Sequence, residues 1–199
     1  ADILILNHYG GDMVNSLTQA IQFGLKDKMV NGNQFEIIVP LYSELMAKGA
    51  GSNIEGVYGS MNWNWQLQDE GTKAFVKSFG EKYGFPPSNA AHTCYVQTLL
   101  YADAVSRAGS FNPCAVVEAL EDFEFDGMGN GQTLYRGSDH QCFKDVLVME
   151  GVASTSGNAN MVGYDTLKIV EETPRAQVEY PEDHPMFAGG SLGECNPGA

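Results

Sequence analysis

The chain has 199 residues, of which 43% are hydrophobic, and this is enough for one large hydrophobic core or two small ones. Asp and Glu total 25 against 11 Lys and Arg, and the resulting net charge of -14 argues against nucleic acid or an anionic membrane as a partner. No apolar run approaches the roughly 18 residues of a membrane-spanning helix, and the first residues, ADILIL, lack the basic segment of a signal peptide, so we expect any export signal to have been removed.

The beginning of the chain alternates between strand and helix patterns. Residues 2–6, DILIL, form an apolar run typical of a buried strand, and helical spacing of apolar residues begins at Met13 and ends before Gly24. After a polar turn at residues 31–33, FEIIVP at residues 35–40 predicts a second strand. This order favours a parallel sheet with helices on its faces.

The next segments predict less regular structure. SELMAKGAGS, residues 43–52, predicts one turn of helix and a glycine-rich loop, and EGVYGSMNW, residues 55–63, predicts a third strand. Trp63 and Trp65 alternate as residues of a strand would, so we expect them on one face, in a core or hinge packing role rather than stacked on a ligand.

Three helices follow in the middle of the chain. Residues 69–83 have an apolar face, and Ser88 or Asn89 is the N-cap of a long helix that continues to residue 108. Asn112 and Pro113, at the first helical position, open a shorter helix to about residue 122. Glycines directly after the first two of these helices predict where they stop.

The last part of the chain is β-prone. FEFDGMGNGQTLYR, residues 123–136, predicts a hairpin, and residues 142–151, CFKDVLVMEG, predict a further strand. A polar loop at residues 154–165 precedes a strand at residues 166–172, TLKIVEE, and we expect irregular structure in the Pro/Gly-rich tail that follows.

The four cysteines, Cys94, Cys114, Cys142 and Cys195, show no CxxC or other zinc-type spacing. Cys195 lies in a tail that would fray unless tied down, so we expect a disulfide in an oxidising compartment, with Cys142 as its partner. Cys94 and Cys114 would lie near opposite ends of adjoining helices and are not expected to pair. His140 and Cys142 form an HxC pattern that is too common to predict a metal site.

The common catalytic motifs are absent from the sequence. It contains no GxSxG, HExxH, Walker A loop or GxGxxG after a strand, and the glycines of GMGNGQ lie between β-prone segments, where they predict a turn. An α/β enzyme with His8 and Asp12 or His140 as acid and base remains an alternative, but it lacks a nucleophile motif. We therefore expect neither catalysis nor a cofactor.

The segment LNHYGGDM, residues 6–13, lies beyond the carboxyl end of a probable parallel strand and at the start of a helix, where open α/β sheets bind ligands. Its glycines let backbone N–H groups approach a ligand, Asn7 and His8 supply hydrogen bonds, and Tyr9 supplies a flat stacking surface. The alternative is a simple turn whose glycines only permit the backbone conformation. Asp12 as helix N-cap would fit either interpretation.

The succession ADILIL-NHYGGDM, FEIIVP, EGVYGSMNWNW, FVKSFGEKYGFPPSNAA and FDGMGNGQTLYRGSDHQC resembles the type I periplasmic solute-binding proteins of ABC transporters, in particular their branched-chain amino-acid, amide and urea binding group. The resemblance extends from residue 1 to about residue 150. It implies an α/β fold of two Rossmann-like lobes, with parallel sheets flanked by helices, that close on a small solute.

By this resemblance, residues 1–60 belong to the second lobe, residues 61–138 to the first, and residues 139–199 to the second lobe and a C-terminal tail. The implied hinge residues are Ser60, Met61, Trp63 and Asp139. Family members are about twice as long, and the part that is missing here would precede residue 1. We therefore expect a C-terminal portion that exposes strand edges and has the missing N-terminal half as its partner.

The resemblance also assigns ligand contacts to the loops after the first two strands. These residues are Asn7, His8, Tyr9, Gly10, Pro40, Leu41 and Tyr42. Amino-acid-binding members often carry an acidic residue where this chain has Leu41, which puts an α-amino acid in doubt and leaves amides, urea-like solutes and aromatic carboxylates open.

The function implied is that of a periplasmic solute-binding component of an ABC importer, with a membrane permease as partner and no cofactor. A ligand-sensing receptor domain of the same fold is the alternative, because it uses the same closure to signal.

Overall fold

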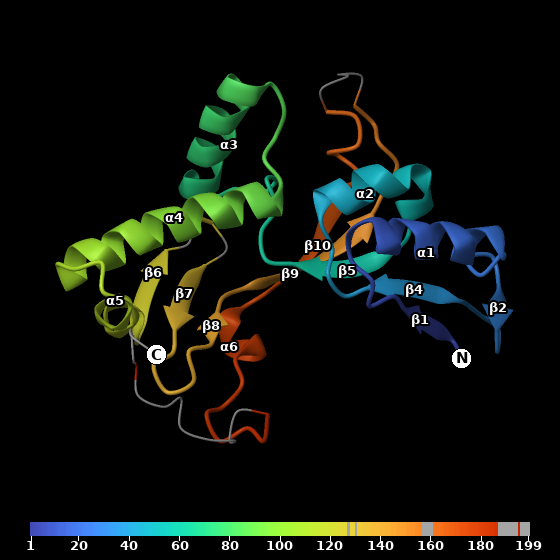
Figure 1. Cartoon of the computed structure of the whole chain (residues 1–199). Helices are drawn as coiled ribbons and strands as arrows, with labels where there is room; N and C mark the ends of the chain where they lie inside the picture. The colour runs from blue at the N-terminus through green and yellow to red at the C-terminus, as the bar shows by residue number, and fades with distance from the viewer. Residues whose placement is uncertain (127, 130, 157–160, 187–194, 196–199) are drawn as a thin grey trace.

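The computed structural model describes residues 1–126, 128–129, 131–156, 161–186 and 195, and its strands form two main sheets (Figure 1). One sheet has five strands in the order β1-β4-β5-β9-β10. Its strands are β1 (Ile3–Ile5), β4 (Glu36–Val39), β5 (Tyr58–Met61), β9 (Val146–Gly151) and β10 (Leu167–Thr173). The first three are parallel, and β9 and β10 are antiparallel to their neighbours.

Two helices cover one face of this sheet, α1 (Gly10–Gln22) and α2 (Glu44–Ala50), and a 3-10 turn η1 (Gly51–Ile54) follows α2 (Figure 1). We call this sheet with α1 and α2 the five-stranded part. β1 lies at the edge of this sheet, and its residues Ile3 and Ile5 are about half exposed.

The second sheet is smaller and accompanied by three helices. It consists of β6 (Phe123–Asp126), β7 (Gln132–Tyr135) and β8 (Cys142–Phe143), and the helices are α3 (Glu70–Tyr83), α4 (Asn89–Ala108) and α5 (Pro113–Leu120). We call these elements the three-stranded part. Figure 1 shows it beside the five-stranded part, with the N-terminal end of α4 directed toward α2.

The core lies between the five-stranded sheet and its helices. Met13 and Leu17 from α1 pack with Val39 from β4 and with Leu147 and Met149 from β9, and all five are essentially inaccessible to solvent. Their burial follows from the helical period in α1 and the alternation along the strands.

The core continues to the boundary with the three-stranded part through Trp63. β5 ends at Met61, so the prediction that Trp63 and Trp65 share one face of a strand is wrong. Trp63 is fully buried against Phe75 of α3, and its ring stacks on the His92 ring of α4 at a centroid distance of 4.2 Å. The expected packing role of Trp63 thus holds without the strand.

The starts and stops of the three central helices follow the local signals. Asp69, Ser88 and Asn112 cap α3, α4 and α5 by accepting backbone N–H groups of the first turns. Gly84 and Gly109 adopt the left-handed conformation that ends α3 and α4. The predicted stops at Gly84 and Gly109 and the start of α4 are confirmed, whereas α5 ends at Leu120, before the predicted residue 122.

Several boundaries near the start of the chain differ from the predictions. α1 begins at Gly10 and not at Met13, so Asp12 lies in its first turn and is not the N-cap. The polar turn is a hairpin of β2 (Met29–Val30) and β3 (Asn33–Gln34), because positive φ angles at Asn31 and Gly32 allow a tight reversal.

Other elements are longer, divided or additional. α2 has seven residues, and the segment predicted as one strand at 142–151 is split between β8 and β9. A short helix, α6 (Arg175–Val178), follows β10. Residues 157–160 of the predicted polar loop, and most of the tail after residue 186, lie outside the described residues.

The chain passes between the two parts three times: after β5, between β8 and β9, and after β10. Ser60, Met61 and Trp63 lie at the beginning of the first passage. Asp139 lies between β7 and β8, and its carboxylate accepts a hydrogen bond from Arg136. β8 pairs with β7 and still belongs to the three-stranded sheet. The second passage is therefore at residues 144–145 and not at the predicted Asp139.

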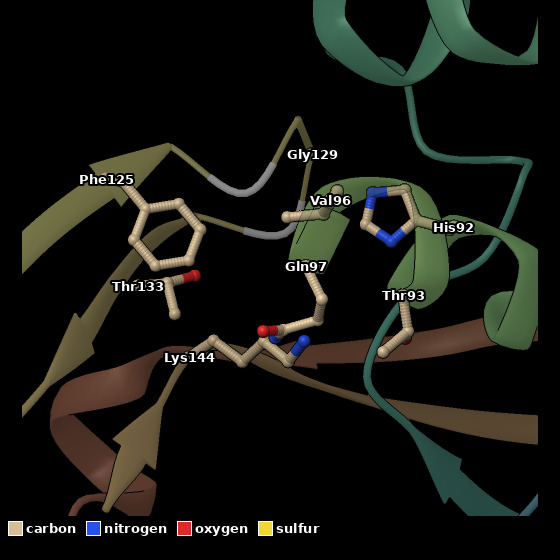
Figure 2. A pocket seen from close by; sticks show the side chains of 8 residues that line it. All are labelled: His92, Thr93, Val96, Gln97, Phe125, Gly129, Thr133 and Lys144. Atoms are coloured by element: carbon tan, nitrogen blue, oxygen red, sulfur yellow. The ribbon is translucent and has the colours of Figure 1, made fainter. Parts of the chain in front are cut away.

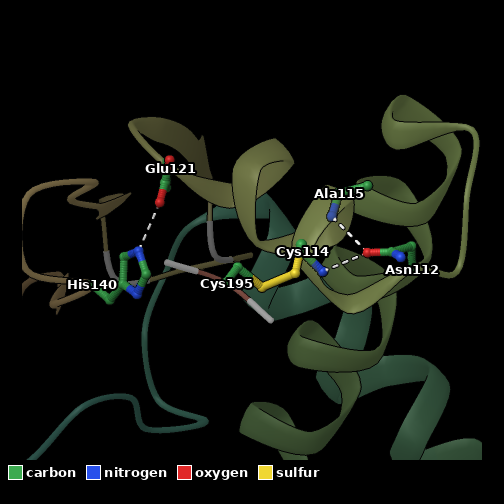
Figure 3. The surroundings of a disulfide bond; sticks show 6 residues. All are labelled: Asn112, Cys114, Ala115, Glu121, His140 and Cys195. Atoms are coloured by element: carbon green, nitrogen blue, oxygen red, sulfur yellow. Dashed lines mark hydrogen bonds and ion pairs between the residues drawn. A yellow bond between two sulfur atoms is a disulfide. The ribbon is translucent and has the colours of Figure 1, made fainter. Parts of the chain in front are cut away.

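The disulfide joins Cys114 to Cys195, whose Cα atoms are 5.5 Å apart, so the predicted pair of Cys142 and Cys195 is wrong (Figure 3). Cys114 is held in the first turn of α5, where its backbone N–H donates to Asn112 Oδ1. Cys142 is a free thiol in β8, opposite Tyr135. The spacing of the cysteines along the chain does not predict this pair, because Cys114 and Cys195 are brought together by the packing of α5.

Candidate solute-binding site

A pocket with a volume of about 390 Å³ lies between the N-terminal halves of α1 and α2. It is at the carboxyl ends of the parallel strands β1 and β4, the edge at which open α/β sheets bind ligands. Ala90 of α4 adds a wall from the three-stranded part. The nine lining residues are Tyr9, Gly10, Gly11, Val14, Ser43, Leu45, Met46, Gly49 and Ala90.

The α1 side of the pocket is made by a sharp change of backbone direction. Tyr9 is extended at the N-cap of α1, and Gly10 begins the helix with φ +60, a conformation that side chains with a Cβ atom rarely adopt. The first N–H groups of a helix have no partner within it, so this turn offers hydrogen-bond donors and a partial positive charge. The Tyr9 side chain is 57% exposed and available for stacking.

The α2 side combines one hydroxyl with apolar side chains. Ser43 caps α2, with its Oγ accepting the N–H of Met46 at 3.2 Å. Leu45 points outward from the first turn and is 55% exposed, although it lines the pocket. None of the nine lining residues carries a charge, so the pocket suits a solute with an apolar body.

Among the residues predicted in the first loop, Tyr9 and Gly10 line the pocket, and Asn7 and His8 do not. Nδ1 of His8 lies 2.7 Å from Ser16 Oγ, which holds the imidazole along α1. Asn7 is exposed.

The second predicted set lies next to the pocket but outside its lining. The carbonyl of Pro40 accepts the Ser60 hydroxyl at 2.6 Å, which ties the end of β4 to β5. Leu41 is 66% exposed. Tyr42 is buried, and its hydroxyl donates to the carbonyl of Val57, so its ring is part of the core. The neighbouring residues Ser43 and Leu45 line the pocket in its place.

Glu44 is a buried carboxylate that the sequence did not indicate. It is completely inaccessible to solvent; its Oε1 accepts from Asn64 Nδ2 at 3.2 Å and its Oε2 from the backbone N–H of Asn89 at 3.0 Å. Burial raises its pKa to about 7, although the N–H groups of Asn89 and of Glu44 itself act in the opposite direction. This contact joins α2 to the first residue of α4.

A second cavity lies between α4, the hairpin of β6 and β7, and Lys144 (Figure 2). Its volume of about 10 Å³ is room for roughly one water molecule, too little for an organic solute. Burial lowers the pKa of Lys144 beside it.

Of the groups considered for acid and base catalysis, His8 and Asp12 both contact Ser16, His8 through its ring and Asp12 through its backbone carbonyl, whereas His140 lies in the other part. His8 bonds to Ser16 in the five-stranded part, and Nε2 of His140 lies 2.8 Å from Glu121 Oε1 in the three-stranded part. Within the described residues, no group of three or more His, Cys, Asp or Glu side chains is placed to hold a metal ion. No helix in this described portion is long and apolar enough to cross a bilayer.

Comparisons with known proteins agree on the class that this fold and site define. A family model described as "Periplasmic binding protein" matches residues 1–158. The amino acid ABC transporter substrate-binding protein of Pseudomonas fluorescens Pf-5 superimposes with a TM-score of 0.75 at 22% identity, over 94% of this chain and 47% of its own. No curated protein matches the sequence of the chain.

Two further solved structures show the same fold. A branched chain amino acid ABC transporter periplasmic ligand-binding protein of Burkholderia xenovorans LB400 has a TM-score of 0.71 at 22% identity, over 91% of this chain and 46% of its own. A solute binding protein of Rhodopseudomonas palustris BisB5, in complex with 3,4-dihydroxy benzoic acid, has a TM-score of 0.66 at 14% identity, over 87% and 45%.

These matches define a type I periplasmic binding protein fold with a pocket at the carboxyl edge of its sheet. The chain belongs to the periplasmic binding protein family, which confirms the resemblance found in the sequence. It spans about half the length of the solved structures that it matches.

Proposed function

We propose that the chain is the C-terminal portion of a periplasmic solute-binding component of an ABC importer, with a membrane permease as partner. The observation that carries the proposal is the pocket of about 390 Å³ at the carboxyl ends of β1 and β4, in a chain of the periplasmic binding protein family. The five-stranded and three-stranded parts would correspond to the second and first lobes. The remainder of the first lobe would come from an N-terminal half outside this chain.

For the solute, we propose a small carboxylate with an aromatic body. Backbone N–H groups at the start of α1 favour an anionic group, and Tyr9, Leu45 and Met46 offer an apolar surface to a ring. An α-amino acid would also place an ammonium group in this pocket, where none of the lining side chains is acidic. The solute binding protein of similar fold that holds 3,4-dihydroxy benzoic acid supports this choice.

Thermal shift and calorimetry with benzoate, 3,4-dihydroxybenzoate, leucine, acetamide and urea test the proposal. A solute that binds only the native protein raises its melting temperature, and we expect this from the benzoates, with the solute recovered unchanged. If none of the five binds, or if the bound solute is turned over, the proposed function is wrong.

Variants locate the site. Tyr9→Ala and Leu45→Ala should each weaken binding about tenfold, equivalent to about 1.4 kcal/mol, because each removes apolar contact with the ring. Phe23→Ala is the matched control, since Phe23 is 83% exposed after the last turn of α1. His8→Ala should also have little effect, because its imidazole is held by Ser16. Equal losses in all four variants would exclude this pocket.

A further inference from the structure

The contact between Glu44 and α4 crosses the boundary of the two parts at the wall of the pocket. Ser43 and Leu45, on either side of Glu44, line the pocket, and so does Ala90, which follows Asn89. The carboxylate of Glu44 thus lies directly behind the place where α2 and α4 face each other. A change in the contact between Glu44 and Asn89 therefore changes the position of the pocket wall that Ala90 forms.

The hydrogen bonds around Glu44 leave little freedom for its position. Asn64 is fully buried; its Oδ1 accepts the N–H of Gln66 at 2.9 Å, so its amide nitrogen is directed at Glu44. Oε2 of Glu44 receives the N–H of Asn89, which belongs to the first turn of α4. One residue of α2 therefore holds the end of a helix from the other part.

The protonation state of Glu44 decides how well this arrangement fits. An ionised carboxylate without solvent contact requires more compensation than the N–H groups of Asn64, Asn89 and Glu44 itself supply, whereas a neutral carboxyl has a much smaller cost of burial. Asn89 Oδ1 is a buried acceptor without a hydrogen-bond partner in the described portion of the chain, and a neutral carboxyl adds a donor to this junction. Separation of α4 from α2 would return Glu44 to water, where ionisation is favourable.

We propose that Glu44 is a proton-operated tie: its neutral form holds the N-terminal end of α4 against α2 at the pocket wall, and its ionised form releases that end. The pocket is then walled on both sides in mild acid and open on the α4 side in mild base. The effect on a solute depends on the proposed function, whereas the tie itself does not.

The other titratable groups near Glu44 have interactions of their own. Lys48, one turn further along α2, places its Nζ 4.1 Å from the centre of the Tyr164 ring. His92, one turn into α4, stacks on Trp63. Of these three groups, Glu44 is the one with a hydrogen bond that joins α2 to the backbone of α4.

Tyr42, on the N-terminal side of Glu44, stays neutral throughout, because burial raises its pKa and its hydroxyl donates to Val57. The pKa of Glu44 is raised to about 7 in the packed state and returns toward 4.5 on release. A raised pKa means that packing is favoured in full below 4.5 and loses this contribution as the pH rises through 7. From pH 5.5 to 7.5 the ratio of packed to released protein should fall about 20-fold.

Hydrogen exchange of the Asn89 amide measures this ratio directly, since its N–H exchanges only when its hydrogen bond to Glu44 is broken. We expect its protection factor, corrected for the intrinsic rate, to fall about 20-fold from pH 5.5 to 7.5. In Glu44→Gln it should not depend on pH. The amide of Ala91 is the internal control, because it donates to Ser88 Oγ within α4 and should keep its protection.

A constant protection factor in the parent protein, or the same fall in Glu44→Gln, would overturn the proposal. The carboxyl titration of Glu44, followed by carbon NMR in the parent protein, decides the matter if the variant does not fold. A midpoint near 7 supports the tie, and a midpoint near 4.5 in the folded protein excludes it. Both measurements are made without solute, so failure of the tie is distinguishable from failure of solute binding.

Discussion

The effect of Glu44→Gln on the free energy of unfolding should change sign between pH 5 and pH 8. Unfolding exposes Glu44, so its pKa falls from about 7 to the ordinary 4.5. An acid whose pKa is raised in the folded state makes folding more favourable at low pH than at high pH. For Glu44 this contribution to the free energy of unfolding disappears as the pH rises through 7. Between pH 5 and pH 8 the linkage amounts to about 2.5 kcal/mol.

The glutamine side chain has nearly the same shape and no charge, but it has one acceptor oxygen for two N–H donors. At pH 5, where the parent carboxyl is neutral, Glu44→Gln should therefore be less stable by about 1 kcal/mol. At pH 8, where ionisation of the parent carboxyl opposes the packed arrangement, the variant should be more stable by about 1.5 kcal/mol, so the swing equals the linkage.

Urea denaturation of both proteins at pH 5 and pH 8 gives the four free energies of unfolding. Because other titrating groups act equally in the two proteins, their contributions cancel in the difference. Glu118→Gln, a change at an exposed residue of α5, should show no swing. A difference between Glu44→Gln and the parent that is the same at both pH values would refute the argument that burial governs this carboxyl.

Other predictions concern the disulfide and the first turn of α1. Cys114→Ser should lower the free energy of unfolding by about 4 kcal/mol, because the bond to Cys195 closes a loop of about 80 residues. Cys142→Ser should cost less than about 1 kcal/mol, and the opposite order in urea denaturation would contradict the pairing. Gly10→Ala should destabilise by about 1–2 kcal/mol because of its φ of +60, whereas Gly11→Ala, without a positive φ, should be neutral or stabilising in thermal unfolding. Equal effects of the two alanines would contradict the strained turn.

Local sequence signals were sufficient for the central helices and for part of the site. A cap such as Ser88 and a stop such as Gly84 act on the neighbouring turn alone, so they can be predicted without knowledge of the rest of the fold. The place of Tyr9 and Gly10 at the pocket also follows from the end of a strand and the start of a helix, and their role as ligand contacts stays a prediction.

Features that depend on distant segments were predicted wrongly or not at all. The choice of Cys114 as the partner of Cys195 depends on where α5 packs, and the division of residues 142–151 into β8 and β9 depends on which sheet each half joins. Tyr42 follows a strand, which is where ligand contacts are expected, but its hydroxyl donates to the carbonyl of Val57 and its ring is buried in the core. In each case the local pattern permits several partners, and tertiary packing selects one.

Glu44 shows why the junction between the two parts is the hardest feature to predict. Directly after the cap Ser43, a glutamate in the first turn of a helix has an ordinary interpretation, a solvated charge that complements the helix dipole. The arrival of α4, which begins 45 residues later at Asn89, turns this exposed position into a fully buried one. Burial reverses the effect of the charge, because the dipole favours the ionised form and the loss of water favours the neutral form. A residue whose local and tertiary environments favour opposite charge states is sensitive to whether the two elements are in contact. The structure has such a residue at the wall of its pocket.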